Sequence, residues 1–171
     1  MQFQVTDAGD LRAVSRALRQ AADGKELRRQ LTKQLRGELR PLVADVKAAW
    51  RAAPSRGRRG RPGPPLRSLL ARATRGEVRL TGREAGVRVR TDGRRMPSGM
   101  RALPGLAEGL GHKVDRRPGR WRHPVYGNRD VWVSQRPFPR FYAAVRPDEA
   151  AARRGVERAV EAVFSQIARA R

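Results

Sequence analysis

The stretch from Trp121 to Pro147 holds most of the large side chains in this chain, and it therefore constrains the fold more than any other segment. It contains two of the three Trp, both Tyr and two of the four Phe, although aromatic residues make up only 5% of the sequence. Aromatic side chains bury the most apolar area per residue, so packing should concentrate here. We expect Trp121, Tyr126, Trp132 and Phe141 to be core or sheet-covering residues, or alternatively to contact a neighbouring subunit.

Local signals within this stretch predict a strand followed by an extended arm. The run from Val131 to Val133 combines β-branched and aromatic residues, and it follows the turn pair Gly127–Asn128. Three prolines then disfavour a helix and favour an extended Pro-rich arm over residues 135–147, which would pack on the chain's own helices or on a neighbouring subunit. These prolines are Pro137, Pro139 and Pro147.

Length and charge limit the architecture and the partners. At 171 residues the chain is long enough for one domain and short for two, so residues 1–171 are expected to form a single domain. The apolar fraction of 39% is rich in alanine, which predicts a modest core and apolar stripes that need a partner. The net charge of +23 opposes compaction unless a polyanion or an acidic surface neutralises it. Arg supplies 35 of the 39 basic residues, which fits either phosphate recognition or a codon bias toward Arg.

Apolar residues at helical spacing predict a helical N-terminal region. Asp10 can cap a first helix that ends near Ala22. A second helix is expected from Lys25 to about Ala53, because leucines, a valine and a tryptophan recur there every three or four residues. The rest of this helix surface would be strongly basic. Pro41 lies inside this stripe, and since the stripe continues in phase we expect one kinked helix rather than two helices.

The remaining patterns complete an α+β domain. Residues 66–74 predict a short helix, and segments 77–81 and 86–90 alternate apolar with polar residues around a Gly-containing loop, which predicts a β-hairpin with one apolar and one basic face. Residues 131–134 are expected to join this hairpin in an antiparallel sheet. A last helix is expected from Pro147 to about Ala170. Its buried stripe is expected to consist of Val156, Val160, Val163, Phe164 and Ile167.

The sequence offers little for catalysis, metal binding or membrane insertion. Without cysteine there are no disulfides, thiolate nucleophiles or Cys-based zinc sites, and the two histidines, His112 and His123, lack ligand spacing. No nucleotide-binding glycine loop and no paired carboxylates are present. No signal peptide or membrane-spanning run is seen, which predicts a soluble protein made in the cytosol. We expect no enzymatic activity, no cofactor and no bound metal.

Residues 54–65 form a loop that is rich in Gly and Pro and contains no apolar residue before its last proline pair. We expect it to be flexible in an isolated subunit, because it cannot join a core. Its arginines could be simply solvated, or they could contact duplex DNA phosphates without reading sequence. Base stacking is not expected, since no aromatic residue lies among them. The candidate DNA-proximal residues are Arg56, Arg58, Arg59 and Arg61.

Three runs in the C-terminal half form a pattern in a fixed order: GRWRHPVYGNR at 119–129, then Trp132, Val133 and Gln135, then PRFYAAV at 139–145. This pattern resembles the C-terminal half of the tail-completion, or neck, proteins of long-tailed bacteriophages. In that family a similar pattern follows a long N-terminal helix and a hairpin and precedes a final helix, which is the order expected here. The Arg-rich loop and residues 96–119 fall outside the pattern.

The resemblance implies a small α+β subunit that forms a ring, usually of six copies, around the DNA path of a virion. Its neighbours would be the head-closure and the tail-terminator or tail-tube proteins, and its location the virion neck, reached from the host cytoplasm. No catalytic residue is carried over. The motif residues, with an implied role in fold and subunit contacts, are Trp121, His123, Pro124, Tyr126, Gly127, Trp132, Gln135 and Phe141.

Two other functions are alternatives to the virion ring. A nonspecific nucleic-acid-binding protein would use Arg36, Arg40 and the four loop arginines, and its binding would fall steeply with salt. A hydrolytic tail enzyme is disfavoured, because the sequence holds no acid–base or metal constellation.

Overall fold

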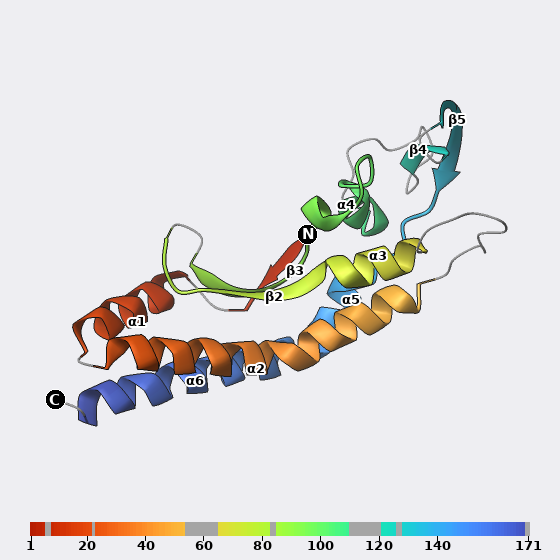
Figure 1. The fold of residues 1–171 in the computed structure, drawn as a ribbon. Helices are drawn as coiled ribbons and strands as arrows, with labels where there is room; N and C mark the ends of the chain where they lie inside the picture. Colours follow the sequence, from red (N-terminus) through yellow and green to blue (C-terminus); the bar gives the residue numbers. More distant parts are fainter. Residues whose placement is uncertain are drawn as a thin grey trace.

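The long helix α2 (Gly24–Arg51) is the element on which the others pack, as the computed structural model of the chain shows. It contacts α1 (Ala8–Gln20), α3 (Leu66–Ala73), α5 (Phe141–Val145), α6 (Glu149–Arg169) and a small antiparallel sheet. Figure 1 shows the sheet above α2 and α6, and a two-stranded hairpin at one end of the molecule. The expected α+β class is confirmed. The structure describes residues 1–5, 8–21, 23–53, 65–82, 85–109, 121–125 and 128–169.

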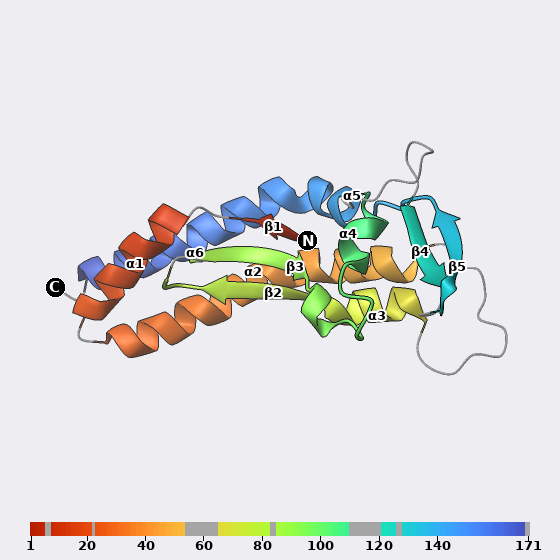
Figure 2. The ribbon, with the colours of Figure 1, turned by 90° about the horizontal axis from the view of Figure 1, so that it is seen from above.

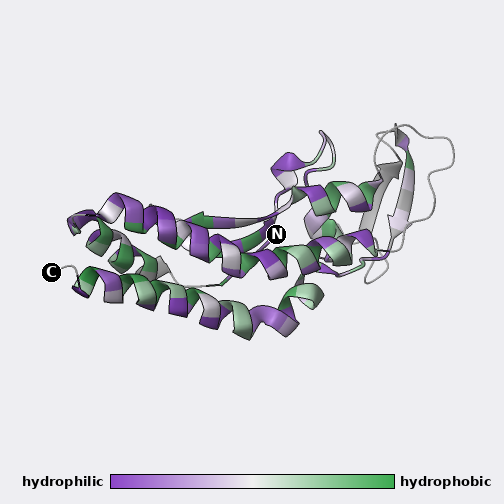
Figure 3. Ribbon diagram, turned by 60° about the horizontal axis from the view of Figure 1, so that its bottom comes forward, coloured by the Kyte–Doolittle hydropathy of each residue, from purple (hydrophilic) through white to green (hydrophobic). Residues whose placement is uncertain are grey.

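Helix α2 forms where the apolar spacing predicts it. Its buried stripe is at most 1% exposed and consists of Leu31, Leu35, Leu39, Leu42, Val46 and Trp50. The helix runs uninterrupted through Pro41, which is exposed, and its axis changes direction along its length (Figures 1 and 3). A proline inside a helix removes one hydrogen bond and crowds the preceding turn, which explains the bend. The prediction of one kinked helix is therefore confirmed.

The apolar stripes of the described helices cover one another. Leu11, Val14 and Leu18 of α1 are at most 4% exposed, and Val156, Val163 and Ile167 of α6 at most 5%. Both long helices alternate polar and apolar residues along their length (Figure 3). The stripes of α1 and α2 are covered by α6 and the sheet within one chain. The predicted burial of the whole α6 stripe is wrong at Phe164, which is 39% exposed, so the prediction that some apolar surface needs a partner stays a prediction there. The predicted Asp10 cap is also wrong, since α1 already includes Ala8.

The three-stranded sheet has the order β1-β3-β2, formed by β1 (Gln2–Gln4), β3 (Gly86–Thr91) and β2 (Thr74–Arg79). The predicted hairpin is confirmed, with Val78 opposite Val87, although β2 begins three residues earlier than expected. The prediction that residues 131–134 complete this sheet is wrong. The third strand of the sheet is β1, in which Phe3 lies opposite Val89 of β3. Residues 131–134 pair instead with residues 121–125.

The sheet packs on α2 through a close approach at Gly76. A Cβ atom built at this position would lie 3.0 Å from Leu39 Cδ1 and 3.4 Å from Val43 Cγ2. Glycine therefore lets the backbone of β2 lie directly against α2.

A buried chain of hydrogen bonds joins α2, α3 and the sheet around Trp50. The Trp50 Nε1–H donates to Thr91 Oγ1 at 3.2 Å, and the hydroxyls of Thr91 and Thr74 are 2.9 Å apart. Thr74 in turn donates to the Leu70 carbonyl at 2.9 Å, so Thr91 must donate to Thr74. The indole N–H of Trp50 and the hydroxyls of Thr74 and Thr91 are therefore all paired. Thr74 and Thr91 are at most 1% exposed, so these hydrogen bonds replace those that water cannot supply.

The C-terminal third contains more helix than its prolines suggested. After the short helix α4 (Leu103–Ala107), strands β4 (Trp121–Val125) and β5 (Asn128–Gln135) form the hairpin, and α5 and a 3-10 turn (Arg146–Asp148) lead into α6. The predicted extended arm over 135–147 is therefore wrong beyond Arg140. The predicted last helix is confirmed, and the short helix at 66–74 likewise. None of the described helices combines the length and apolarity that crossing a membrane requires.

Candidate functional site

The hairpin of β4 and β5, hereafter the terminal hairpin, brings most of the motif residues together. Its antiparallel register places Trp121 opposite Gln135 and Pro124 opposite Trp132, and it places His123 opposite Val133. Tyr126 and Gly127 lie outside the described residues, as do the side chains of β4 and of Gln135. The four loop arginines, Arg56, Arg58, Arg59 and Arg61, and the predicted flexibility of their loop also lie outside them.

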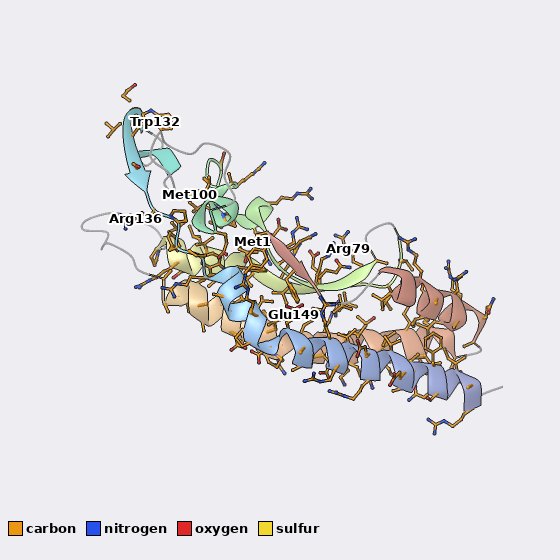
Figure 4. All side chains as sticks on the ribbon, turned by 180° about the vertical axis from the view of Figure 1, so that it is seen from behind. Met1, Arg79, Met100, Trp132, Arg136 and Glu149 are labelled. Carbon is orange, nitrogen blue, oxygen red and sulfur yellow. The ribbon has the colours of Figure 1, made fainter. Side chains whose placement is uncertain are left out.

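The terminal hairpin exposes two large apolar side chains. Val131 is 50% exposed and Trp132 is 48% exposed. Figure 4 shows Trp132 near the far end of the hairpin, away from the helices, whereas Arg136 lies where the chain rejoins the body. The prediction that Trp132 is a core residue is wrong, because the hairpin extends beyond the helical body. An exposed Trp and Val on a projecting two-stranded ribbon are typical of a surface that a partner covers.

Phe141, the last motif residue, is part of the body. It is fully buried, as predicted, and its ring packs edge-to-face on Tyr142 with 5.2 Å between ring centroids. The motif therefore divides into a projecting part on the hairpin and a core part on α5, joined by residues 136–140.

Residues 136–140 are held on the chain's own body. The Phe138 N–H donates to the Ala107 carbonyl at 2.8 Å, and the Phe138 ring packs edge-on against Trp50 with 6.3 Å between centroids. Glu108 Oε1 accepts from the N–H groups of Arg140 and Phe141, the latter at 2.5 Å. A carboxylate at the start of α5 satisfies amides that have no partner within the helix. Sequence analysis missed Glu108, because a cap that lies more than thirty residues away leaves no local pattern.

We expect Glu108→Gln to loosen the junction between the terminal hairpin and the body. The substitution keeps the size of the side chain but removes the charge from two hydrogen bonds, which should cost about 1 kcal/mol of unfolding free energy. Hydrogen exchange should accelerate at the amides of Arg140 and Phe141, while the amides within α2 stay protected. Glu157→Gln, at an exposed position of α6, serves as the control. Unchanged exchange at Arg140 and Phe141 would contradict the proposed anchoring role.

The polar face of the sheet carries a network of charged residues, hereafter the sheet network. Glu77 pairs with Arg75 at 2.7 Å, with Arg88 at 3.2 Å and with Arg90 at 3.8 Å. Asp92 pairs with Arg75 at 3.0 Å and with Arg90 at 3.6 Å. The predicted basic face is thus partly neutralised, and both carboxylates are shielded, with side chains only 10% and 5% exposed.

Asp92 has the clearest electrostatic perturbation in this network. Burial alone would raise its pKa, but the hydrogen bond from the Arg94 N–H and the charges of Arg90 and Arg75 outweigh burial and hold the pKa below its usual value. Asp92 therefore stays ionised and paired, which suits a structural role better than proton transfer.

Another exposed apolar residue, Phe164, lies at the opposite end of the molecule. Phe164 is 39% exposed and lies five residues before the end of α6 at Arg169. Figure 1 shows the C-terminal end of α6 and the terminal hairpin at opposite ends of the elongated fold. Among the residues whose side chains the structure describes, the exposed large apolar ones are Val131 and Trp132 at one end, hereafter the first patch, Phe164 at the other end, hereafter the second patch, and Met100. Among the described residues no three His, Cys, Asp or Glu side chains gather in a way that could hold a metal ion.

Comparison with family models, with curated proteins and with solved structures finds no match to this chain.

Proposed function

We propose that this chain is a structural virion subunit of the tail-completion class. In this proposal identical copies form a ring that joins the head connector to the tail tube around the DNA path, and six copies are expected. The observation that carries it is the pair of exposed apolar patches at opposite ends of one elongated chain. The resemblance of residues 119–145 to neck proteins supports the same proposal.

The two patches are suited to a heterologous interface. In a closed ring one surface of each subunit meets a different surface of the next, so each copy needs two complementary patches that lie apart. We propose that Val131 and Trp132 of one subunit pack against the α6 surface around Phe164 of its neighbour. Trp132 would anchor the contact, because aromatic residues dominate the binding energy of interfaces.

Mixed variants test this arrangement directly. Trp132→Ser and Phe164→Ser should each prevent ring closure and leave monomers, since every interface then lacks one patch. When the two variants are mixed, one intact interface can form between unlike copies but cannot propagate. Native mass spectrometry should then find dimers that contain one copy of each variant.

Two controls keep the result interpretable. Because both side chains are partly exposed, each variant should keep the melting temperature of the parent chain within a few degrees. A matched exposed substitution, Met100→Ser, should leave assembly unchanged, since Met100 is 37% exposed but is not assigned to either patch. Rings that persist in both single variants would contradict the proposed interface.

A nonspecific nucleic-acid-binding protein is the second candidate, favoured by the net charge of +23. Tight duplex binding by free monomers with a steep dependence on salt would favour it. Duplex binding that appears only in the assembled ring would favour the virion subunit instead.

A further inference from the structure

The basic residues of α2 gather on one side of the helix. At 3.6 residues per turn, seven of them fall within an arc of about 80°. All of the seven are exposed except Lys47, which is half-buried. This set, hereafter the basic flank, consists of Lys25, Arg29, Lys33, Arg36, Arg40, Lys47 and Arg51.

The acidic residues of α2 lie outside that arc. Glu38 and Asp45 fall on the opposite side of the helix by the same spacing. Glu38 faces α6, because a Cβ atom built at Gly155 would collide with its carboxylate. Only Glu26 lies near the basic flank, and its ion pair with Arg29 is long, at 3.8 Å between exposed groups. The positive charge of the flank is therefore largely uncompensated within α2.

The fold turns the basic flank outward beside the sheet. Leu39 and Val43, which adjoin the flank on the helix, contact β2 at Gly76. The flank thus lies on the β2 side of α2, away from α6. Figure 2 shows the N-terminal half of α2 emerging beyond the β2 edge, on the side opposite α6.

The chemistry of this surface fits a phosphate backbone. A surface groove at its N-terminal end is lined by Lys25, Arg28, Arg29, Thr32, Lys33 and Arg36. No aromatic side chain occurs in this set, so bases of a single strand have nothing to stack on. Insertion into a membrane surface would need an exposed apolar face, whereas the apolar stripe of α2 is buried inside the protein.

We propose that the basic flank of α2 binds the sugar-phosphate backbone of duplex nucleic acid without reading its sequence. The proposal rests on the DNA path of the proposed function and assigns that contact to this helix. The segment from Lys25 to Arg40 extends over about 22 Å at 1.5 Å per residue, enough to follow several phosphates of one strand. Each phosphate that a basic side chain neutralises releases counterions, so binding must weaken as salt rises.

A charge-matched pair of variants tests the assignment. Lys33→Gln with Arg36→Gln removes two charges from the basic flank. Arg154→Gln with Arg158→Gln removes two exposed charges from α6, where they alternate with Glu157 and Glu161. Binding to a mixed-sequence 20-base-pair duplex is measured by fluorescence anisotropy over a range of salt concentrations. Ring formation is measured on the same samples by native mass spectrometry.

The flank variant should lower the slope of log affinity against log salt by about 1.8 and weaken binding at 0.15 M salt by about 30-fold. The α6 variant should change affinity by about twofold or less. Equal losses of duplex affinity in both variants would overturn the assignment. Binding to phosphatidylserine vesicles is measured as well. A flank variant that loses vesicle binding while its duplex binding is unchanged would also overturn the assignment. If rings form but the flank variant and the α6 variant bind the duplex equally well, only the assignment of duplex binding to the basic flank is contradicted. If the protein stays monomeric but the flank variant still binds the duplex more weakly than the α6 variant, only the proposed function is contradicted.

Discussion

Trp50→Ala should lower the free energy of unfolding by about 3–5 kcal/mol, the range seen when a buried Trp is truncated. Trp50 is completely buried at the end of α2, and its ring supports Phe138 of the segment that leads from the terminal hairpin into α5. Its removal would leave a large cavity and would deprive Thr91 of its hydrogen-bond donor. Urea unfolding followed by far-ultraviolet circular dichroism measures the change.

Trp50→Phe separates packing from hydrogen bonding. The Phe ring retains most of the buried volume but cannot donate to Thr91, so the loss should be smaller, about 1–2 kcal/mol. A loss below about 1 kcal/mol in Trp50→Ala would show that the end of α2 is not part of the cooperative core.

Asp92→Asn should destabilise the fold by about 2–3 kcal/mol at neutral pH. Removing one partner of a shielded ion pair leaves the other charge without compensation, and here Arg75 and Arg90 lose a carboxylate. The effect should be smaller than for a fully buried pair, because Arg75 and Arg90 remain partly solvated and Glu77 still pairs with both.

The same substitution has a defined dependence on pH. The pKa of Asp92 is lower in the folded chain than its usual value, so the unfolded state binds the proton more tightly. The stabilisation by this carboxylate is fully present above the unfolded-state pKa of about 3.9 and is lost as the pH falls through the folded-state pKa. The difference in stability between the parent chain and Asp92→Asn should therefore shrink in acid.

Glu161→Gln is the matched control, since Glu161 is an exposed carboxylate on α6. It should change stability by less than about 0.5 kcal/mol. A difference between the parent chain and Asp92→Asn that stays constant from neutral pH into acid would contradict the assigned role of the carboxylate.

Local periodicity was sufficient to predict α1, α2, α3, α6 and the β2–β3 hairpin, but not the five-residue helices α4 and α5. The apolar stripe from Leu31 to Trp50 predicted α2 closely, because one strongly amphipathic face admits one way of burial. Strand β1 was not predicted, since three residues with a single apolar side chain carry no measurable alternation. Its position depends on pairing with β3, which lies more than eighty residues away.

The aromatic stretch shows where sequence alone was insufficient. A concentration of large side chains indicates that an apolar surface exists but not whether the chain itself or another molecule covers it. Phe141 is buried within the body of the protein, whereas Trp132 is exposed on the terminal hairpin. The difference arises from β4 pairing with β5 instead of β5 joining the larger sheet, and from Glu108 fixing the start of α5. Both depend on contacts between distant segments.

The central claim, that this chain assembles through its two ends into a closed ring, is tested most directly by native mass spectrometry of the unmodified protein. We predict one dominant assembly whose mass is an integer multiple of the 19.2 kDa chain, with six copies expected, and few open intermediates. A mass that remains that of a single chain at every concentration and salt condition, or a ladder of open oligomers without a closed species, would contradict it.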